Sequence, residues 1–359
     1  MKESPTTTPR RRFRVITRKA VWRLSGLFFV IVLVLGVCWH IMLRMPGRSH
    51  RGPFPPRSPA QVALAAELRG DVETLAVRIG RRSTFHPAEL ERCADFIAQR
   101  LESAGYQVNR PTFVSRGEKV SNIEAVLKGT ANPAEIVVVG AHYDSYDGLS
   151  GADDNASGVA GVIALANRFA QHPQARTIRF VLFVNEEPPA FWTPDMGSWV
   201  YAKACRAAGD KVVGMLSLES IGCYSDRPGS QHYPPPLGSF FPDTGNFIAF
   251  VGNTSSRSLV HDAIGTFRAT TPFPSEGAAL PGLLPGVGWS DHWSFWKEGY
   301  PALMVTATAP YRNEHYHTPA DRPEDLDYER TARVVDGLER VVRHLAGEAG
   351  PGLAGATAR

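Results

Sequence analysis

Cysteine is scarce in this sequence, and the few cysteines show no paired spacing. The 359 residues contain four of them, Cys38, Cys93, Cys205 and Cys223. That number is too small for a disulfide-rich scaffold, and no Cys-x-x-Cys pair is present to build a thiolate zinc site. Spacing alone leaves open whether Cys205 and Cys223 pair. With 43% hydrophobic and 21% charged residues, the chain is expected to bury an ordinary globular core.

Acidic residues are nearly absent from the first 60 positions. Residues 1–60 contain twelve Lys or Arg and a single acidic residue, Glu3, whereas the rest of the chain contains 27 Lys or Arg and 34 Asp or Glu. The positive charge therefore belongs to one end of the chain, and the remainder is net acidic. Because an acidic body repels phosphates, nucleic acid is not an expected partner.

Charged residues are missing altogether between Arg23 and Arg44. A helix of these twenty residues would span about 30 Å, the thickness of a hydrocarbon core. Eight Lys or Arg precede the run and four follow it before residue 60, which favours a cytoplasmic N-terminus. We expect a cytoplasmic basic tail over residues 1–23 and an uncleaved transmembrane signal anchor over residues 24–43 in the cell (inner) membrane, with the rest of the chain periplasmic or extracellular. A cleaved signal peptide and a buried core helix are the alternatives, and the flanks and the missing small-x-small site disfavour them.

The segment after the anchor lacks apolar periodicity. Pro46 to Pro59 contains five prolines, so residues 44–60 are expected to form a semi-extended spacer between membrane and body. The body is expected over residues 61–346, followed by a flexible C-terminal tail over residues 347–359.

The body alternates short apolar runs with helical patterns. We expect strands at 136–139, 178–184, 212–218, 247–251 and 302–306, and helices at 87–104, 158–169, 196–208, 258–267 and 328–345. This alternation predicts one α/β domain, a three-layer α/β/α arrangement with a mostly parallel central sheet. Two Pro- and Gly-rich segments, 225–245 and 271–288, fit neither pattern and are expected to be loops over a cleft.

Histidines and carboxylates gather where the predicted strands end. Four strand ends are followed by the segments 142–144, 185–187, 219 and 314–317, and Asp153-Asp154-Asn155 begins a helix. Ligand sites of open α/β sheets lie beyond the carboxyl ends of the strands. Crowded carboxylates repel one another, and a divalent cation relieves that repulsion. Two His and several carboxylates without cysteine suit zinc, and a bridging carboxylate would allow two ions.

Four motifs in order resemble those of zinc-dependent exopeptidases of metallopeptidase family 28, the bacterial aminopeptidase type. They are His142-x-Asp144, Gly151-Ala-Asp-Asp-Asn-Ala-Ser-Gly158, Asn185-Glu-Glu187 and Tyr316-His-Thr-Pro319, and the resemblance covers nearly all of residues 85–345.

The resemblance implies a ligand set for two zinc ions. His142 and Glu219 would bind the first ion, Glu187 and His317 the second, and Asp154 would bridge them. Many relatives have Asp at the position of Glu219.

The resemblance also implies roles for four further side chains. Glu186 would be the general base that takes a proton from water, and Tyr316 would polarise the scissile carbonyl. Asp144 would hold the His142 ring, and Asp291, in a Ser-Asp-His motif, would belong to a supporting hydrogen-bond network.

The expected activity is therefore metal-dependent hydrolysis of peptides by an aminopeptidase. One alternative is a glutaminyl cyclase-like acyltransferase with a single zinc, and another is a non-catalytic receptor-like module on the same fold. A serine hydrolase has little support because no Gly-x-Ser-x-Gly motif is present. The preferred N-terminal residue, the peptide length, the metal used in the cell and the oligomeric state are not predicted.

Overall fold

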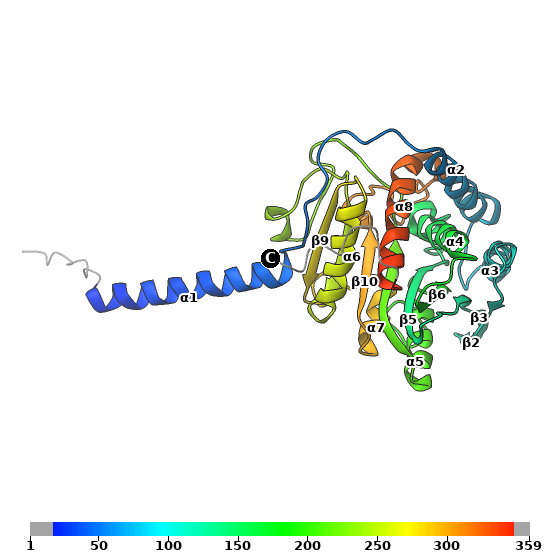
Figure 1. Ribbon diagram of the computed structural model, residues 1–359, viewed down its shortest axis with the longest axis horizontal. Coiled ribbons are helices and arrows are strands. Elements are labelled where there is room, and N and C mark those ends of the chain that lie inside the picture. Colours follow the sequence, from blue (N-terminus) through cyan, green and yellow to red (C-terminus); the bar gives the residue numbers. More distant parts are fainter. Residues whose placement is uncertain (1–16, 348–359) are drawn as a thin grey trace, which may run out of the picture. The chain divides into compact units, whose positions relative to one another are not determined.

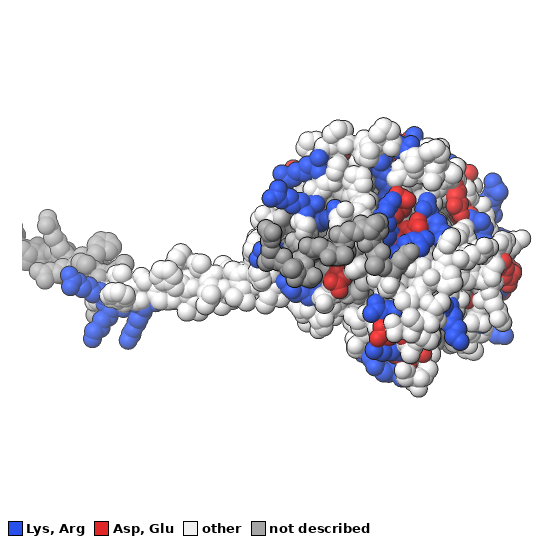
Figure 2. All heavy atoms as spheres, viewed as in Figure 1, with Lys and Arg blue, Asp and Glu red and all other residues white. Residues whose placement is uncertain are grey.

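The computed structural model describes residues 17–347, and the chain divides after Ile41 into two units (Figure 1). The predictions for residues 1–16 of the basic tail and for the tail from residue 348 lie outside the described residues. Helix α1, Arg18–Met42, in which no side chain is buried, belongs to the first unit except for its last residue. The helix is long and apolar enough to cross a membrane, and basic residues gather at its beginning (Figure 2).

The second unit is built on an eight-stranded sheet in the order β1-β4-β6-β5-β7-β10-β8-β9. The strands are β1 (Val108–Asn109), β4 (Ile123–Leu127), β5 (Asn132–His142), β6 (Arg176–Phe183), β7 (Lys211–Glu219), β8 (Ile248–Asn253), β9 (Ser275–Leu280) and β10 (Ala302–Thr306). The four central strands β6, β5, β7 and β10 are parallel, whereas β4 and β8 run antiparallel to their inner neighbours. Strands β2 (Thr112–Ser115) and β3 (Glu118–Ser121) form a separate hairpin.

Helices cover both faces of the sheet, so the predicted three-layer arrangement is confirmed (Figure 1). The larger core includes α2 (Pro59–Glu73), α3 (Pro87–Ser103), α4 (Gly158–Phe169), α6 (Arg257–Thr270) and α8 (Tyr328–Leu345), and the smaller core includes α5 (Gly197–Ala208) and α7 (His292–Lys297). Strand β5 shows why its sequence is a continuous apolar run: Val137 and Val139 belong to the larger core, and Ile136 and Val138 to the smaller one.

One predicted loop contains a strand. Residues 271–288 include the edge strand β9, which pairs in parallel with β8. Its sequence Ser-Glu-Gly-Ala-Ala-Leu has small residues where β-branched ones are usual, so no strand pattern shows. Residues 225–245 do remain irregular apart from a short 3₁₀ turn, Leu237–Ser239.

The proline-rich segment does not stand free as a spacer, because it lies against the body. The Ser49 hydroxyl accepts a hydrogen bond from the backbone N–H of Ser275, and the ring of Phe54 stacks on Phe273 with the centroids 5.3 Å apart. The guanidinium of Arg333 donates to the carbonyl of Pro55. These contacts take the place of water around polar and apolar groups of an extended segment.

Candidate metal centre

The structure brings the five predicted ligands to one edge of the sheet. His142 and Glu219 are the last residues of β5 and β7, and Glu187 follows β6. Parallel strands end at a common edge, so these side chains converge. Asp154 reaches them from the turn Ala152–Ser157 before α4, in which its backbone leaves the helical region. His317 comes from the loop after β10.

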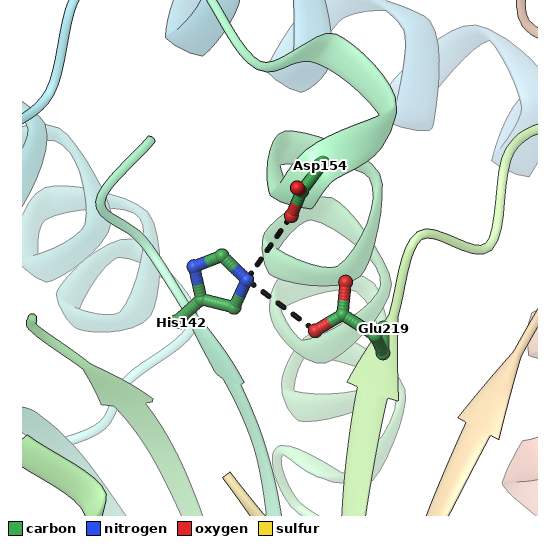
Figure 3. A group of neighbouring side chains, drawn as sticks. All are labelled: His142, Asp154 and Glu219. Carbon is green, nitrogen blue, oxygen red and sulfur yellow. Dashed lines mark ion pairs between the residues drawn. The ribbon is translucent and has the colours of Figure 1, made fainter. Parts of the chain in front are cut away.

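Asp154 stands between two groups of ligand atoms. Its Oδ1 lies 3.2 Å from His142 Nε2, which is also 3.3 Å from Glu219 Oε2 (Figure 3). Its Oδ2 lies 3.0 Å from His317 Nε2, which is 3.2 Å from Glu187 Oε1. In each of these triplets the ligand atoms all lie within 4.8 Å of one another. One carboxylate therefore faces both triplets, as a bridging ligand must.

The donor atoms are the kind that zinc binds, and the protein does not satisfy them otherwise. Among residues 17–347, His142 Nε2, His317 Nε2 and Glu187 Oε1 are buried without a hydrogen-bond partner. Such atoms are costly in a protein interior unless something else binds them. Imidazole nitrogens and carboxylate oxygens are common zinc ligands, so these residues fit the metal.

The charges of the centre are unbalanced without a cation. Burial raises the pKa of Glu187 to about 8, the neighbouring Asp154 adds to this, and His317 opposes it. Burial lowers the pKa of His317, but the carboxylates of Asp154 and Glu187, 3.0 and 3.2 Å from its Nε2, outweigh this and raise it to about 10. Burial also lowers the pKa of His142. The carboxylates of Glu186 and Glu219 outweigh this, so the pKa of His142 is raised. Crowded carboxylates thus favour the charged form of both imidazoles.

Asp144 supports the site in a way that differs in detail from the expectation. Its backbone carbonyl lies 3.1 Å from His142 Nδ1, whereas its carboxylate is 3.6 Å from that atom. The carboxylate instead accepts hydrogen bonds from the backbone N–H groups of Glu186 and Glu187, at 3.1 and 3.0 Å. Asp144 therefore orients the His142 ring with its carbonyl and fixes the Glu186-Glu187 turn with its side chain.

Glu186 and Tyr316 lie beside the two triplets. The Glu186 carboxylate is buried, with Oε2 3.9 Å from His142 Nε2. The Tyr316 ring stacks on His317 with the centroids 3.9 Å apart. Burial and the nearby carboxylates raise the pKa of Tyr316, so its phenol stays protonated and able to donate a hydrogen bond.

Asp291 is the predicted residue for which the structure gives a different result. It is fully buried, but neither carboxylate oxygen has a well-oriented hydrogen-bond partner in the described part of the chain. Burial raises the pKa of Asp291 to about 7, against the opposing effects of His142 and Ser198. Its neighbour Ser290 makes the supporting hydrogen bond instead, by donating to Glu219 Oε2 at 2.8 Å.

Several residues that hold the site together were not predicted. The Asp321 carboxylate accepts from the backbone N–H groups of Asp153 and Asp154, and Asn155 Oδ1 accepts from Gly158 and Ser220. The fully buried Arg82 donates to five backbone carbonyls, those of Leu75, Gly80, Tyr143, Ser150 and Gly151. The Asp153-Asp154-Asn155 run signalled a helix start, but nothing in the sequence around Arg82 or Asp321 pointed to these contacts.

A largely apolar cavity shares Glu219 and Tyr316 with the centre. Its lining includes Tyr233, Phe241, Phe247, Val251, Leu280 and Met304. Thr306 and Ala249, which follow Glu219 in the register across β10 and β8, also line it. Small side chains next to the centre thus leave room for a large apolar group.

Comparisons with known proteins agree with this fold. The protein YfbL of Escherichia coli (strain K12), described as uncharacterized, is 35% identical over 285 residues, which cover 77% of this chain and 87% of YfbL. The structure of BSAP, a zinc aminopeptidase from Bacillus subtilis, has a TM-score of 0.64 and 15% identity, and covers 79% of this chain and 95% of that one. The glutaminyl cyclase of Porphyromonas gingivalis has a TM-score of 0.57 and 20% identity, and covers 78% and 98%.

The similarity to these two solved structures shows the fold. Membership of a family is shown by a match to a family model. The model described as Peptidase family M28 matches residues 122–342, which is more than half of the chain and includes all five candidate ligands. The chain therefore belongs to peptidase family M28, and the prediction of a zinc metallopeptidase is confirmed.

Proposed function

We propose that this protein is a membrane-anchored aminopeptidase that uses two zinc ions. The observation that carries the proposal is the position of Asp154, whose two oxygens face His142 on one side and His317 on the other, at 3.2 and 3.0 Å. A single-ion enzyme needs one such triplet, and this chain has two that share a carboxylate.

The residues of the centre would act either as metal ligands or in proton transfer. His142 and Glu219 would hold one ion, Glu187 and His317 the other, and Asp154 both. Zinc supplies Lewis acidity, which acidifies water and polarises a carbonyl. Glu186 takes the proton from the attacking water and delivers it to the leaving amine.

Tyr316 and the apolar cavity act on the substrate. The protonated Tyr316 phenol donates a hydrogen bond to the scissile carbonyl oxygen, where negative charge develops. The cavity beside Glu219 takes the side chain of the N-terminal residue, and its lining favours a large apolar one.

Metal content and substrate range test the proposal together. The purified full-length chain should contain two zinc ions by elemental analysis, and it should cleave aminoacyl amides and free peptides but not the same peptides with blocked N-termini. Equal cleavage of blocked peptides would exclude an aminopeptidase. One zinc ion per chain, with a pyroglutamyl product from a Gln-initiated peptide, would favour the glutaminyl cyclase-like alternative, which a solved structure of the same fold keeps open.

The anchor is proposed on separate grounds. Helix α1 carries its basic residues at its N-terminal end and its apolar residues in one uncharged run (Figure 2). We propose that α1 spans the membrane with its N-terminus in the cytoplasm and holds the peptidase body on the periplasmic or extracellular side.

A further inference from the structure

The wall of the apolar cavity contacts the residues that end the anchor. Ala278, Leu280 and Val287 form a small buried cluster, and Met42 and Leu43 pack against it. These two residues belong to the same unit as the peptidase body. Leu43 is the last residue of the uncharged run, so the run ends next to the cavity wall.

The loops around this contact are apolar and exposed. The segments 233–242 and 280–289, here called the apolar rim, contain no Asp, Glu, Lys or Arg. Both contribute to the lining of the cavity. Their exposed large side chains are Phe240 at 54%, Leu283 at 99%, Leu284 at 38% and Trp289 at 40%. A fully exposed Leu283 beside other exposed apolar groups marks an interaction surface rather than ordinary scatter.

The proposed membrane anchor indicates which partner covers the apolar rim. Arg44 is the first charged residue after the run, so with α1 across the membrane Met42 and Leu43 would lie at the boundary between hydrocarbon and headgroups. Pro46 and Ser49, which follow shortly after, are hydrogen-bonded to the body, so this part of the chain lies against it. Uncharged loops with an exposed Trp suit the membrane interface.

We propose that the apolar rim lies in the interface of the bilayer that holds α1, so that the cavity beside the metal centre opens at the membrane surface. The inference rests on the proposed membrane anchor. It implies that peptides held close to the lipid surface reach the site more readily than peptides in bulk solution.

Lipid photocrosslinking tests the proposal on the full-length chain in vesicles of phosphatidylcholine and phosphatidylglycerol. The photoreactive residue p-benzoylphenylalanine replaces Leu283 in one variant and Val114 in a control. Val114 is 70% exposed on the β2–β3 hairpin, so it is, like Leu283, an apolar residue that is mostly exposed. A third variant carries the probe in place of Trp39, within α1.

We expect at least ten times more lipid adduct at position 283 than at position 114, with strong adduct formation at position 39. Equal adduct at 283 and 114, or none at 283 while 39 reacts, would overturn the rim proposal and leave the anchor intact. No adduct at position 39 would show that α1 is not inserted, in which case the anchor fails and the rim proposal with it. None of these crosslinking results tests the proposed zinc chemistry, which is measured by metal content and peptide cleavage.

Discussion

Glu186 is the single residue whose chemistry is easiest to separate from metal binding. Its carboxylate lies 3.9 Å from His142 Nε2 in the first triplet, and it belongs to neither triplet. Glu186→Gln keeps the shape of the side chain and removes its basicity, so we expect kcat to fall by about 10²–10⁴ while zinc content is unchanged. The matched control is Glu314→Gln, an exposed carboxylate two residues before Tyr316, which should leave turnover at the wild-type level. Unaltered turnover of the Glu186 variant would remove it as the base.

His317 tests the second triplet. Its side chain is 25% exposed, so its loss is not expected to unfold the protein. His317→Ala removes the ligand atom that pairs with both Asp154 and Glu187. We expect the variant to retain about one zinc ion per chain by elemental analysis, whereas His315→Ala, an exposed neighbour, should retain both. Two zinc ions in the His317 variant would contradict its role as a ligand.

The raised pKa values of the histidines make metal binding depend on pH. The pKa of His317 is raised to about 10 and that of His142 is also raised, so the surrounding carboxylates favour the protonated form of each imidazole. Zinc binds only the neutral imidazole, so each ion must displace protons. We expect the dissociation constant for zinc to decrease by at least about tenfold per pH unit between pH 6 and pH 8, as measured by competition with a chelator of known affinity. A dissociation constant that is flat over this range would show that the imidazoles are already neutral.

Among the elements, those with a strong pattern were predicted well. Helices α4 and α8 and strand β10 begin and end at the predicted residues, because each has a regular apolar face or a continuous buried run. The five candidate ligands were also predicted to lie together, because strand ends locate three of them and motifs locate Asp154 and His317.

The missing parts of the prediction share a physical cause. Strand β9 is built from small residues, and α2 has only a weak apolar stripe. Asp321 and three of the five hydrogen bonds of Arg82 reach backbone groups 61 or more positions away, and such contacts leave no local sequence pattern. The packing of the proline-rich segment was missed for a similar reason: its partners, Phe273 and Ser275, are far along the chain.

Strand β8 offers a test of the substrate cavity. Ala249 is the small residue two strands from Glu219 in the register, and it lines the cavity. Ala249→Leu fills space next to the site, so kcat/KM for a leucyl amide should fall by about tenfold or more relative to an alanyl amide. Because the measurement is a ratio on one enzyme preparation, a general loss of folded protein cancels. An unchanged ratio would place the N-terminal side chain elsewhere.

At the scale of the whole molecule, the distribution of charge is the dominant feature. The first 60 residues hold a large basic excess, whereas the rest of the chain has more Asp and Glu than Lys and Arg. The positive charge is thus placed where it would orient the proposed anchor, and the acidic residues include those that would bind zinc. The residues expected to set membrane orientation and the residues of the peptidase body therefore lie in different parts of the chain.

This separation predicts the orientation of the chain in the membrane. Alkaline phosphatase, which is active only outside the cytoplasm, should be active when fused to the end of the full chain, and a cytoplasmic reporter at the same position should be inactive. Replacing Arg10, Arg11, Arg12 and Arg14 by Asn halves the eight positive charges before the run and leaves the four behind it, so the bias disappears. The variant should then show a mixture of orientations. A cytoplasmic reporter that is active on the unaltered chain would reverse the topology, and it would place the peptidase body and its apolar rim on the opposite side of the membrane.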